Sequence, residues 1–148
     1  MYVDSDHIKK WIENDLACLV NNEVSNEFAK YLNTLKWSSS GSHLDVNESD
    51  FNSINLSKSE ETKFIDDINK STNYKNKKLY FFYKKNEPCL VCELNFGLKN
   101  IDYAYSRAPG YRFMFCETSM SESTFDSFKN ILMYDHGDIL YYKKHLIS

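Results

Sequence analysis

The chain has 148 residues, of which 42% are hydrophobic and 16% aromatic, and its formal net charge at pH 7 is −3. These values fit one domain spanning residues 1–148 with a sizeable core, and they exclude a disordered chain. The four glycines form none of the spacings of phosphate-binding loops, and the mild acidity provides no basic footprint for nucleic acid. We therefore expect neither a nucleotide cofactor nor a nucleic-acid partner.

The N-terminal residues show no basic segment followed by an apolar core, so we expect no signal peptide. No apolar run approaches the roughly 20 residues that a membrane span needs. These features predict a soluble cytoplasmic protein with no membrane partner. Its four cysteines would then be reduced thiols.

Residues 5–36 carry the apolar spacing of amphipathic helices. Asn favours caps and turns over helix interiors, so Asn21-Asn22 is expected to divide this run into two helices. A loop of flexible composition follows at residues 38–42. The apolar positions that recur every three or four residues are Ile8, Ile12, Leu16, Leu19, Val20, Val24, Phe28, Leu32 and Leu35.

Residues 44–68 are acidic, with seven carboxylates and two lysines, whereas residues 69–86 contain six lysines and no acidic residue. Ser57-x-x-Glu60 is a capping-box pattern, which predicts a short helix over the residues that follow it. The acidic segment is either an ordinary solvated surface or a negative patch. Such a patch would steer a basic partner and block a site built for phosphate.

Short β-branched or aromatic runs come next, separated by gaps that only antiparallel hairpins can span. A second capping box, Ser119-x-x-Glu122, predicts a helix with its C-cap at Gly137, and residues 139–147 form a last strand. The order predicts an α+β fold with N-terminal helices, an antiparallel four- to five-stranded sheet arranged as a meander, and a C-terminal helix before a last strand. The four predicted meander strands are residues 79–83, 89–96, 101–107 and 111–118.

Cys89-Leu90-Val91-Cys92 matches the C-x-x-C pattern of redox and metal sites. On a strand, residues three apart point to opposite faces, so these two thiols could not reach one metal ion or form an easy disulfide. Redox C-x-x-C motifs open helices instead, and the second paired ligand motif of a zinc site is missing. We interpret both cysteines as packing residues of the sheet and expect no metal site.

The only two arginines, Arg107 and Arg112, flank Ala108-Pro109-Gly110, whose Pro-Gly pair fits a type II turn. In the predicted hairpin they would lie opposite one another on one face, where they could bind a carboxylate or phosphate. The alternative is a solvated hairpin tip. Asp102 and Glu117 would oppose one another across the same hairpin, either as an acid–base pair or as ordinary rim residues.

Two further patterns concern RNA binding and hydrolysis. Residues 110–115 partly resemble the RNA-stacking strand of an RRM, but its basic, small and last aromatic positions differ, so an aromatic core is the preferred interpretation. The histidines His7, His43, His136 and His145 are scattered, and His136 is expected to cap the C-terminal helix. No G-x-S-x-G or H-E-x-x-H motif is present.

The general profile of the chain is similar to that of bacterial immunity proteins from contact-dependent growth inhibition and related polymorphic toxin systems. The shared features are one acidic α+β domain of this size, rich in Lys and Asn, without a catalytic motif. The resemblance implies a cytoplasmic, non-catalytic protein that binds a cognate toxin domain, often a basic nuclease, and occludes its active site. It implies no cofactor, no metal and no small-molecule substrate.

The partner surface that this hypothesis predicts consists of acidic residues and exposed tyrosines, because tyrosines often supply hot-spot area at interfaces. Two alternatives remain open. One is a small nuclease or toxin-like enzyme that uses Arg107, Arg112 and His136, and the other is a non-catalytic adaptor or RNA-binding module. The predicted partner-binding residues are Asp45, Glu48, Asp50, Glu60, Glu61, Asp66, Asp67, Tyr103, Tyr105, Arg107, Tyr111 and Arg112.

Overall fold

The computed structural model describes residues 2–37, 44, 51–56, 60–70, 78–107, 112–116, 132–136 and 138–143. Its helices are α1 (Asp6–Glu13), α2 (Asn22–Leu32), α3 (Glu61–Lys70), α4 (Leu94–Lys99) and α5 (Ile101–Ala104). Its strands are β1 (Ala17–Leu19), β2 (Phe51–Asn55), β3 (Lys78–Phe82), β4 (Leu90–Glu93), β5 (Arg112–Cys116), β6 (Leu132–His136) and β7 (Ile139–Lys143).

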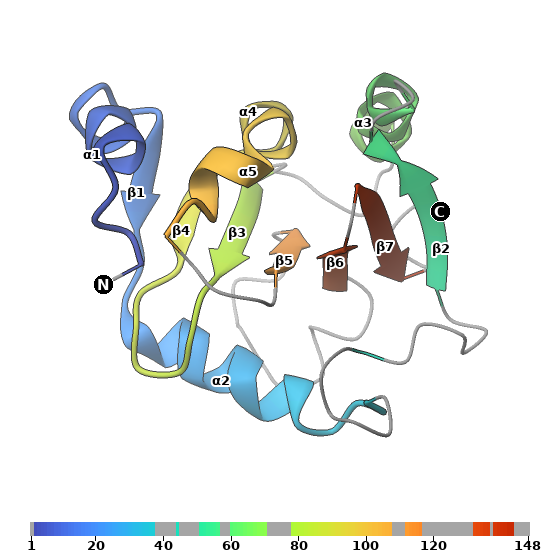
Figure 1. The fold of residues 1–148 in the computed structure, drawn as a ribbon, viewed down its shortest axis with the longest axis horizontal. Helices are drawn as coiled ribbons and strands as arrows, with labels where there is room; N and C mark the ends of the chain where they lie inside the picture. Colours follow the sequence, from blue (N-terminus) through green and yellow to red (C-terminus); the bar gives the residue numbers. More distant parts are fainter. Residues whose placement is uncertain are drawn as a thin grey trace.

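In this described part of the chain, the seven strands form one antiparallel sheet in the order β1-β4-β3-β5-β6-β7-β2. Strands β1 and β2 are therefore its two edges (Figure 1). The predicted α+β class, with N-terminal helices and an antiparallel sheet, is confirmed. The sheet is not a simple meander, because β3 lies between β4 and β5.

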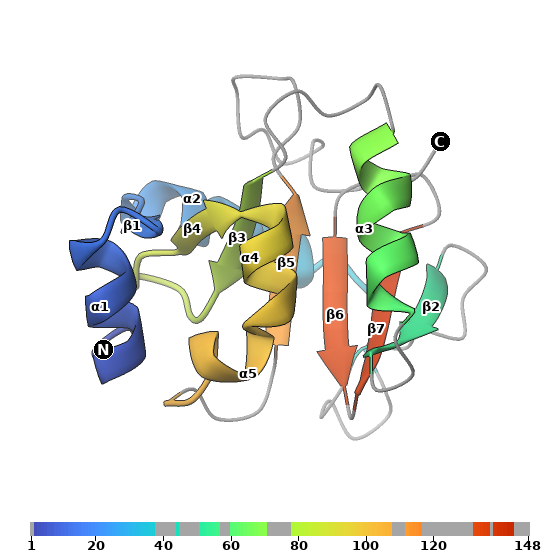
Figure 2. The same ribbon diagram turned by 90° about the horizontal axis from the view of Figure 1, so that it is seen from above.

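The helices cover both faces of the sheet. Helices α1, α5, α4 and α3 lie along one face, and α2 crosses the opposite face (Figures 1 and 2). Along the first face, α1 packs against α5, α5 against α4, and α4 against α3. None of the helices in the described ranges combines the length and the apolar character that a membrane crossing requires.

Capping residues set the ends of the two N-terminal helices. Ser5 Oγ accepts a hydrogen bond from the N–H of Ile8 at the start of α1. Asn21 Oδ1 accepts one from the N–H of Glu23 and begins α2, so the predicted start of the second helix is confirmed. The first helix was predicted to extend to Asn21 and this is wrong, because α1 ends at Glu13, before the left-handed residue Asp15. The short strand β1, which lies between these helices, was not predicted.

An aromatic layer fills the space between α2 and the sheet. Phe28 of α2 is fully buried, and its ring centroid lies 5.1 Å from that of Phe82 and 4.6 Å from that of Phe115. The rings of Tyr80 and Phe115 stack on neighbouring strands, 4.7 Å apart. These contacts join β3 and β5 to α2, so this layer is one half of the hydrophobic core.

Gly97 allows α4 to lie close to the other face of the sheet. A Cβ at this position would lie 2.7 Å from Leu79 Cδ2 and 2.8 Å from Cys92 Sγ, closer than real Cβ atoms approach. Leu79 and Cys92 are register partners on β3 and β4. The absence of a side chain at Gly97 therefore sets the spacing between the helix and these strands.

We expect Gly97→Ala to lower the free energy of unfolding by about 1–3 kcal/mol, because the added methyl overpacks the core. This loss would outweigh the gain of about 1 kcal/mol in helix propensity. In a Cys92→Ala background, Gly97→Ala should cost less stability than it does in the wild-type protein, because Cys92 Sγ, one of the two clashing atoms, is already absent. Urea denaturation measures all three. A Gly97→Ala protein as stable as the wild type would contradict this packing.

Three predicted elements are wrong in type or extent. Residues 101–107, predicted as a strand, form α5 and a turn, so β5 pairs with β3 and β6. The strand predicted over residues 89–96 ends at Glu93, where α4 begins. Residues 132–136, predicted as the end of a helix, form β6. The rest of that helix and its C-cap Gly137 lie outside the described residues.

Two predicted elements, a helix in the acidic segment and the last strand, are confirmed. The helix expected after Glu60 is confirmed as α3, although Ser57 of its capping box lies outside the described residues. The last strand is confirmed as β7 for Ile139–Lys143. Strand β2, which pairs with β7 at the sheet edge, was not predicted.

Candidate protein-binding surface

Four of the predicted acidic residues lie at the start of α3 or along it. The backbone carbonyl of Glu60 accepts from the N–H of Phe64, and its Oε2 accepts from the N–H of Asn55, which ties β2 to this helix. Asp66 is exposed, whereas Glu61 and Asp67 are partly buried. Partial burial raises the pKa of Glu61, while the charge of Lys99 lowers it.

The α3 region therefore presents a moderately acidic surface. Its four carboxylates are offset by two lysines, Lys63 and Lys70. The other predicted residues of the acidic patch, Asp45, Glu48 and Asp50, lie outside the described residues, as does Tyr111.

An aromatic row crosses α4, α1 and α5. It consists of Phe96, Trp11, His7 and Tyr103, and consecutive ring centroids are 5.2, 6.5 and 4.6 Å apart. His7 and Trp11 are four residues apart on α1 and so share one side of that helix. Tyr103 is 50% exposed and His7 is also exposed, so the row opens to solvent at this end.

Two acidic residues are next to members of the exposed end of the aromatic row in the sequence. Asp6 precedes His7 on α1, and Asp102 precedes Tyr103 on α5. Both acidic residues are exposed, Asp102 with 85% of its side chain accessible. The structure thus places the predicted hot-spot residue Tyr103 on a surface that combines aromatic and negative groups.

Tyr105 was predicted to be exposed, and this is wrong. Its side chain is buried under the end of the β3–β5 ladder, where its hydroxyl lies 3.1 Å from the carbonyl of Phe82 and 2.6 Å from that of Phe113. These two residues are register partners. Burial raises the pKa of Tyr105 well above its usual value, so the hydroxyl stays protonated and its single hydrogen is shared between these two carbonyls.

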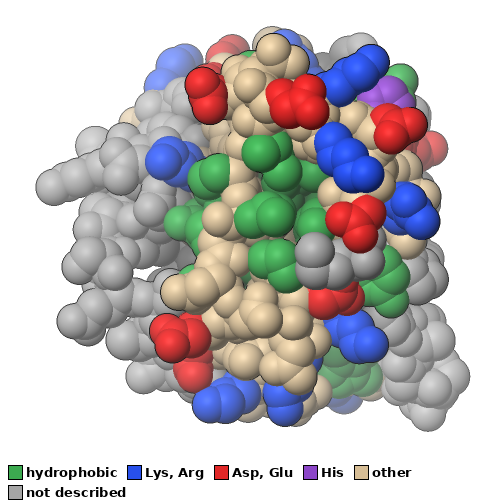
Figure 3. Space-filling view, turned by 90° about the vertical axis from the view of Figure 1, so that its left-hand side faces the viewer, with side chains coloured by type: hydrophobic (Ala, Val, Ile, Leu, Met, Phe, Trp, Pro, Cys, Tyr) green, Lys and Arg blue, Asp and Glu red, His purple; other side chains and the backbone are tan. Residues whose placement is uncertain are grey.

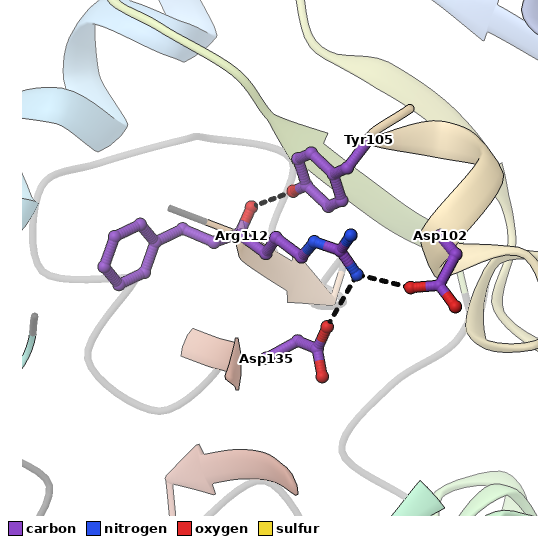
Figure 4. Close-up of polar contacts among 5 residues, drawn as sticks. Asp102, Tyr105, Arg112 and Asp135 are labelled. Atoms are coloured by element: carbon purple, nitrogen blue, oxygen red, sulfur yellow. Dashed lines mark hydrogen bonds and ion pairs between the residues drawn. The ribbon is translucent and has the colours of Figure 1, made fainter. Parts of the chain in front are cut away.

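Arg112 lies between two carboxylates. Its Nη1 donates to Asp102 of α5 and, at 3.1 Å, to Asp135 of β6, its register partner (Figure 4). Its guanidinium also lies 5.8 Å from the ring centroid of Tyr105. The cluster therefore links α5, β5 and β6. The predicted role of Arg112 as an anion ligand is weakened because two carboxylates already balance its charge.

Asp135 is the buried member of this cluster. Its side chain is 6% exposed, and its second oxygen, Oδ1, has no hydrogen-bond partner in the described structure. Burial raises the pKa of Asp135, and the hydrogen bond and charge of Arg112 oppose that rise. Neither Asp135 nor its contact with Arg112 was predicted, because the residue falls within a segment read as helix.

Arg107 does not face Arg112 across a hairpin, and that prediction is wrong. It lies in the turn after α5, and its Nη1 donates to the backbone carbonyl of Asp4. The hairpin that was expected to oppose Asp102 and Glu117 does not form, because Asp102 lies on helix α5, and Glu117 lies outside the described residues. Arg107 instead lines a pocket of about 620 Å³ together with Tyr2, Lys84, Lys85, Asn86 and Glu87.

The two cysteines of the C-x-x-C pattern pack on opposite faces of the sheet, as predicted. Cys89 Sγ lies 3.2 Å from Ser25 Oγ of α2, whereas Cys92 lies beneath Gly97 of α4. Burial raises the pKa of Cys89 to about 11 and that of Cys92 to about 12, because a buried thiolate loses its hydration. Both are therefore protonated thiols at neutral pH.

The sequence contained one signal for the aromatic row, the i, i+4 spacing of His7 and Trp11, but the row is assembled from three helices. Its other members come from α4 and α5, which were predicted as strand. Among the described residues, no three His, Cys, Asp or Glu side chains gather as a metal site would need. Comparisons of the chain with family models, curated proteins and solved structures give no match.

Proposed function

We propose that this protein is a cytoplasmic immunity protein. Its partner is a cognate toxin domain, a basic nuclease, which it neutralises by occluding the active site. The observation that carries the proposal is the exposed end of the aromatic row, where Asp6 is next to His7 in the sequence, while the second nearby carboxylate, Asp102, is paired with Arg112. Tyrosine and tryptophan dominate the binding energy of protein interfaces, and carboxylates beside them favour a basic partner.

The acidic α3 supports the same function. It lies on the same face of the sheet as α1, α4 and α5, so its carboxylates and the aromatic row belong to one helical layer (Figure 2). Exposed carboxylates of this kind raise the association rate with a positively charged protein, and added salt screens the effect. A protein that blocks a nuclease gains from such steering, because the nuclease site is built for phosphate.

The test begins with the neighbouring gene, which should encode a secreted protein with a cytotoxic C-terminal domain. That domain, made as an inactive variant and mixed with this protein, should elute as one complex in size-exclusion chromatography. Raising the salt concentration should weaken the complex. Separate elution of the two proteins at micromolar concentration, or nuclease activity in this chain alone, would contradict the immunity function.

We expect Tyr103→Ala to weaken binding of that toxin domain by at least about tenfold, because truncation of a central interface tyrosine removes aromatic contact area. Isothermal titration calorimetry measures the dissociation constant. The matched control is Tyr141→Ala, since Tyr141 alternates with Tyr142, whose ring packs on Phe64 of α3, and therefore lies on the opposite face. Equal affinity of the Tyr103→Ala and wild-type proteins would remove the aromatic row from the interface.

A further inference from the structure

Strand β1 is an edge of the sheet, and in the described chain β4 is the only strand that pairs with it. Cys18 is the register partner of Val91, and the N–H of Val20 donates to the carbonyl of Cys89 at 3.1 Å. In an antiparallel pair, alternate residues direct their backbone groups to the neighbouring strand. The N–H and C=O groups of Ala17 and Leu19 therefore point away from β4, towards the outer edge.

Strand β1 carries no lysine, proline or inward charge against strand pairing, and its short length of three residues is the one protective feature that it shares with natural edge strands. Natural edge strands are commonly guarded by lysine, proline, inward charges or a covering loop. Residues 16–20 read Leu-Ala-Cys-Leu-Val, without a charge or a proline. The turn into β1 is well fixed: Asp15, with φ of 59°, and Leu16 donate to the carbonyls of Ile12 and Trp11, the pattern of a Schellman motif. The backbone groups of β1 are thus held in place for pairing.

Apolar side chains are exposed along the same edge. Three large hydrophobic side chains are exposed in the described chain, and two of them are Leu16, at 47%, and Leu19, at 40%. Cys18 between them is also exposed. Figure 3 shows this side of the molecule, where hydrophobic side chains gather in a patch surrounded by acidic and basic groups. Such a rimmed patch is typical of a protein interaction site.

A pocket of about 380 Å³ lies at the start of β1 and defines the charge of a suitable partner. Its charged lining residues are Asp15, Glu93 and Lys78. Lys78 and Glu93 are register partners on β3 and β4, and two acidic residues against one lysine give the lining an excess of one negative charge. A lysine or arginine side chain therefore complements this pocket, with apolar stem atoms against Leu16 and Phe96.

The opposite edge of the sheet differs from β1. Strand β2 exposes the polar side chains of Asn52 and Ser53, and the ring of its Phe51 lies under the ammonium group of Lys143. An apolar segment would gain less buried surface there. The combination of outward backbone groups, exposed leucines and a negative pocket therefore belongs to β1.

The geometry points to β1 as the docking edge for an extended segment of the toxin domain, which adds to the sheet as a further strand. Its backbone pairs with Ala17 and Leu19, its apolar side chains cover Leu16 and Leu19, and its lysine or arginine enters the pocket beside Asp15. Strand addition of this kind draws affinity from main-chain hydrogen bonds and specificity from alternate side chains. The inference rests on the proposed function, since the toxin domain is the partner.

Hydrogen exchange of the wild-type protein tests this docking, with the inactive toxin domain encoded by the neighbouring gene as the probe. In the complex, exchange at the amides of Ala17 and Leu19 should slow by about tenfold or more. A complex that forms without a change at these amides overturns docking at β1 and leaves the immunity function standing. Failure to form any complex overturns the immunity function and this inference with it. Concentration-dependent protection in the protein alone would assign the edge to a second copy of this chain instead.

Leu19→Pro provides an independent test, because proline removes an outward N–H without removing a hydrogen bond to β4. It should weaken binding of the toxin domain by at least about tenfold. The control Leu19→Val keeps the N–H and most of the apolar side chain, and should cost no more than about threefold. The melting temperatures of both variants verify that they are folded. Equal affinities of the two variants would overturn the strand-addition geometry.

Discussion

Arg112→Met is expected to lower the free energy of unfolding by about 2–4 kcal/mol at pH 7, because it leaves the buried carboxylate of Asp135 without its cation. This loss of stability is smaller than that expected on breaking a wholly buried ion pair, because about a third of the Arg112 side chain is exposed. The double variant Arg112→Met/Asp135→Asn should recover most of the loss, because its position 135 carries no charge. Urea denaturation at pH 7 measures both. The other arginine supplies the control: Arg107→Met should change stability by less than about 0.5 kcal/mol.

The loss should also depend on pH, with a sign that follows from the raised pKa of Asp135. Above the unfolded value of 3.8, the folded state holds this proton more tightly than the unfolded state, so stability falls as pH rises through the folded pKa. Removing Arg112 removes the interactions that lower that pKa and extends this fall to higher pH. The variant should therefore approach the wild type near pH 4 and differ most at pH 7. A loss that is constant from pH 4 to pH 7 would contradict this role for Asp135.

Phe28→Ala should cost about 3–5 kcal/mol, because it removes a fully buried ring from the layer between α2 and the sheet. The cavity would lie between Phe82 and Phe115, whose rings contact Phe28 from neighbouring strands. Phe28→Leu retains most of the volume and should cost less than about 1.5 kcal/mol. Thermal and urea unfolding measure both variants.

The surface of the same helix offers a matched control for Phe28→Ala. Lys30→Ala removes an exposed side chain whose partner is Glu27, three residues earlier, and should change stability by less than about 0.5 kcal/mol. If Phe28→Ala were no more destabilising than Lys30→Ala, α2 would not pack on β3 and β5 as described.

The parts of the fold that were predictable depend on local signals. The capping residue Asn21 and the pattern after Glu60 both act within one helical turn, so α2 and α3 could be placed from sequence. The opposite faces of Cys89 and Cys92 followed from strand alternation alone. Strand β1 has three residues, too few for any period to be recognised.

The error over residues 94–101 arose where two periodicities overlap. Leu94, Gly97, Leu98 and Ile101 follow the i, i+3, i+4, i+7 spacing of a helix, and all four are buried. The alternation through β4 extended the strand prediction to residue 96, so residues 97–100 were predicted as a turn and residues 101–107 as the next strand. The close approach of Gly97 to the sheet, a tertiary contact, favours the helix at this place.

The wrong strand prediction over residues 101–107 also explains why most of the contacts on the candidate surface were not predicted. Because α5 is a helix, Tyr103 reaches His7 and Tyr105 turns into the core, whereas a strand would have placed both tyrosines on one face. Arg112 likewise meets Asp135 only through the register of β5 and β6, which no local pattern encodes. For this surface, the residue types could therefore be chosen from the sequence more reliably than the contacts between those residues.

Protection of growing bacteria tests the immunity function most directly. The active C-terminal toxin domain encoded by the neighbouring gene is expressed from an inducible promoter, with or without this protein, and colony-forming units are counted. The proposed function predicts full survival of cells with the wild-type protein and reduced survival of cells with the Tyr103→Ala variant. Cells that express the toxin domain without this protein should die. Equal killing with and without the wild-type protein, when both proteins are present in soluble form, would contradict it.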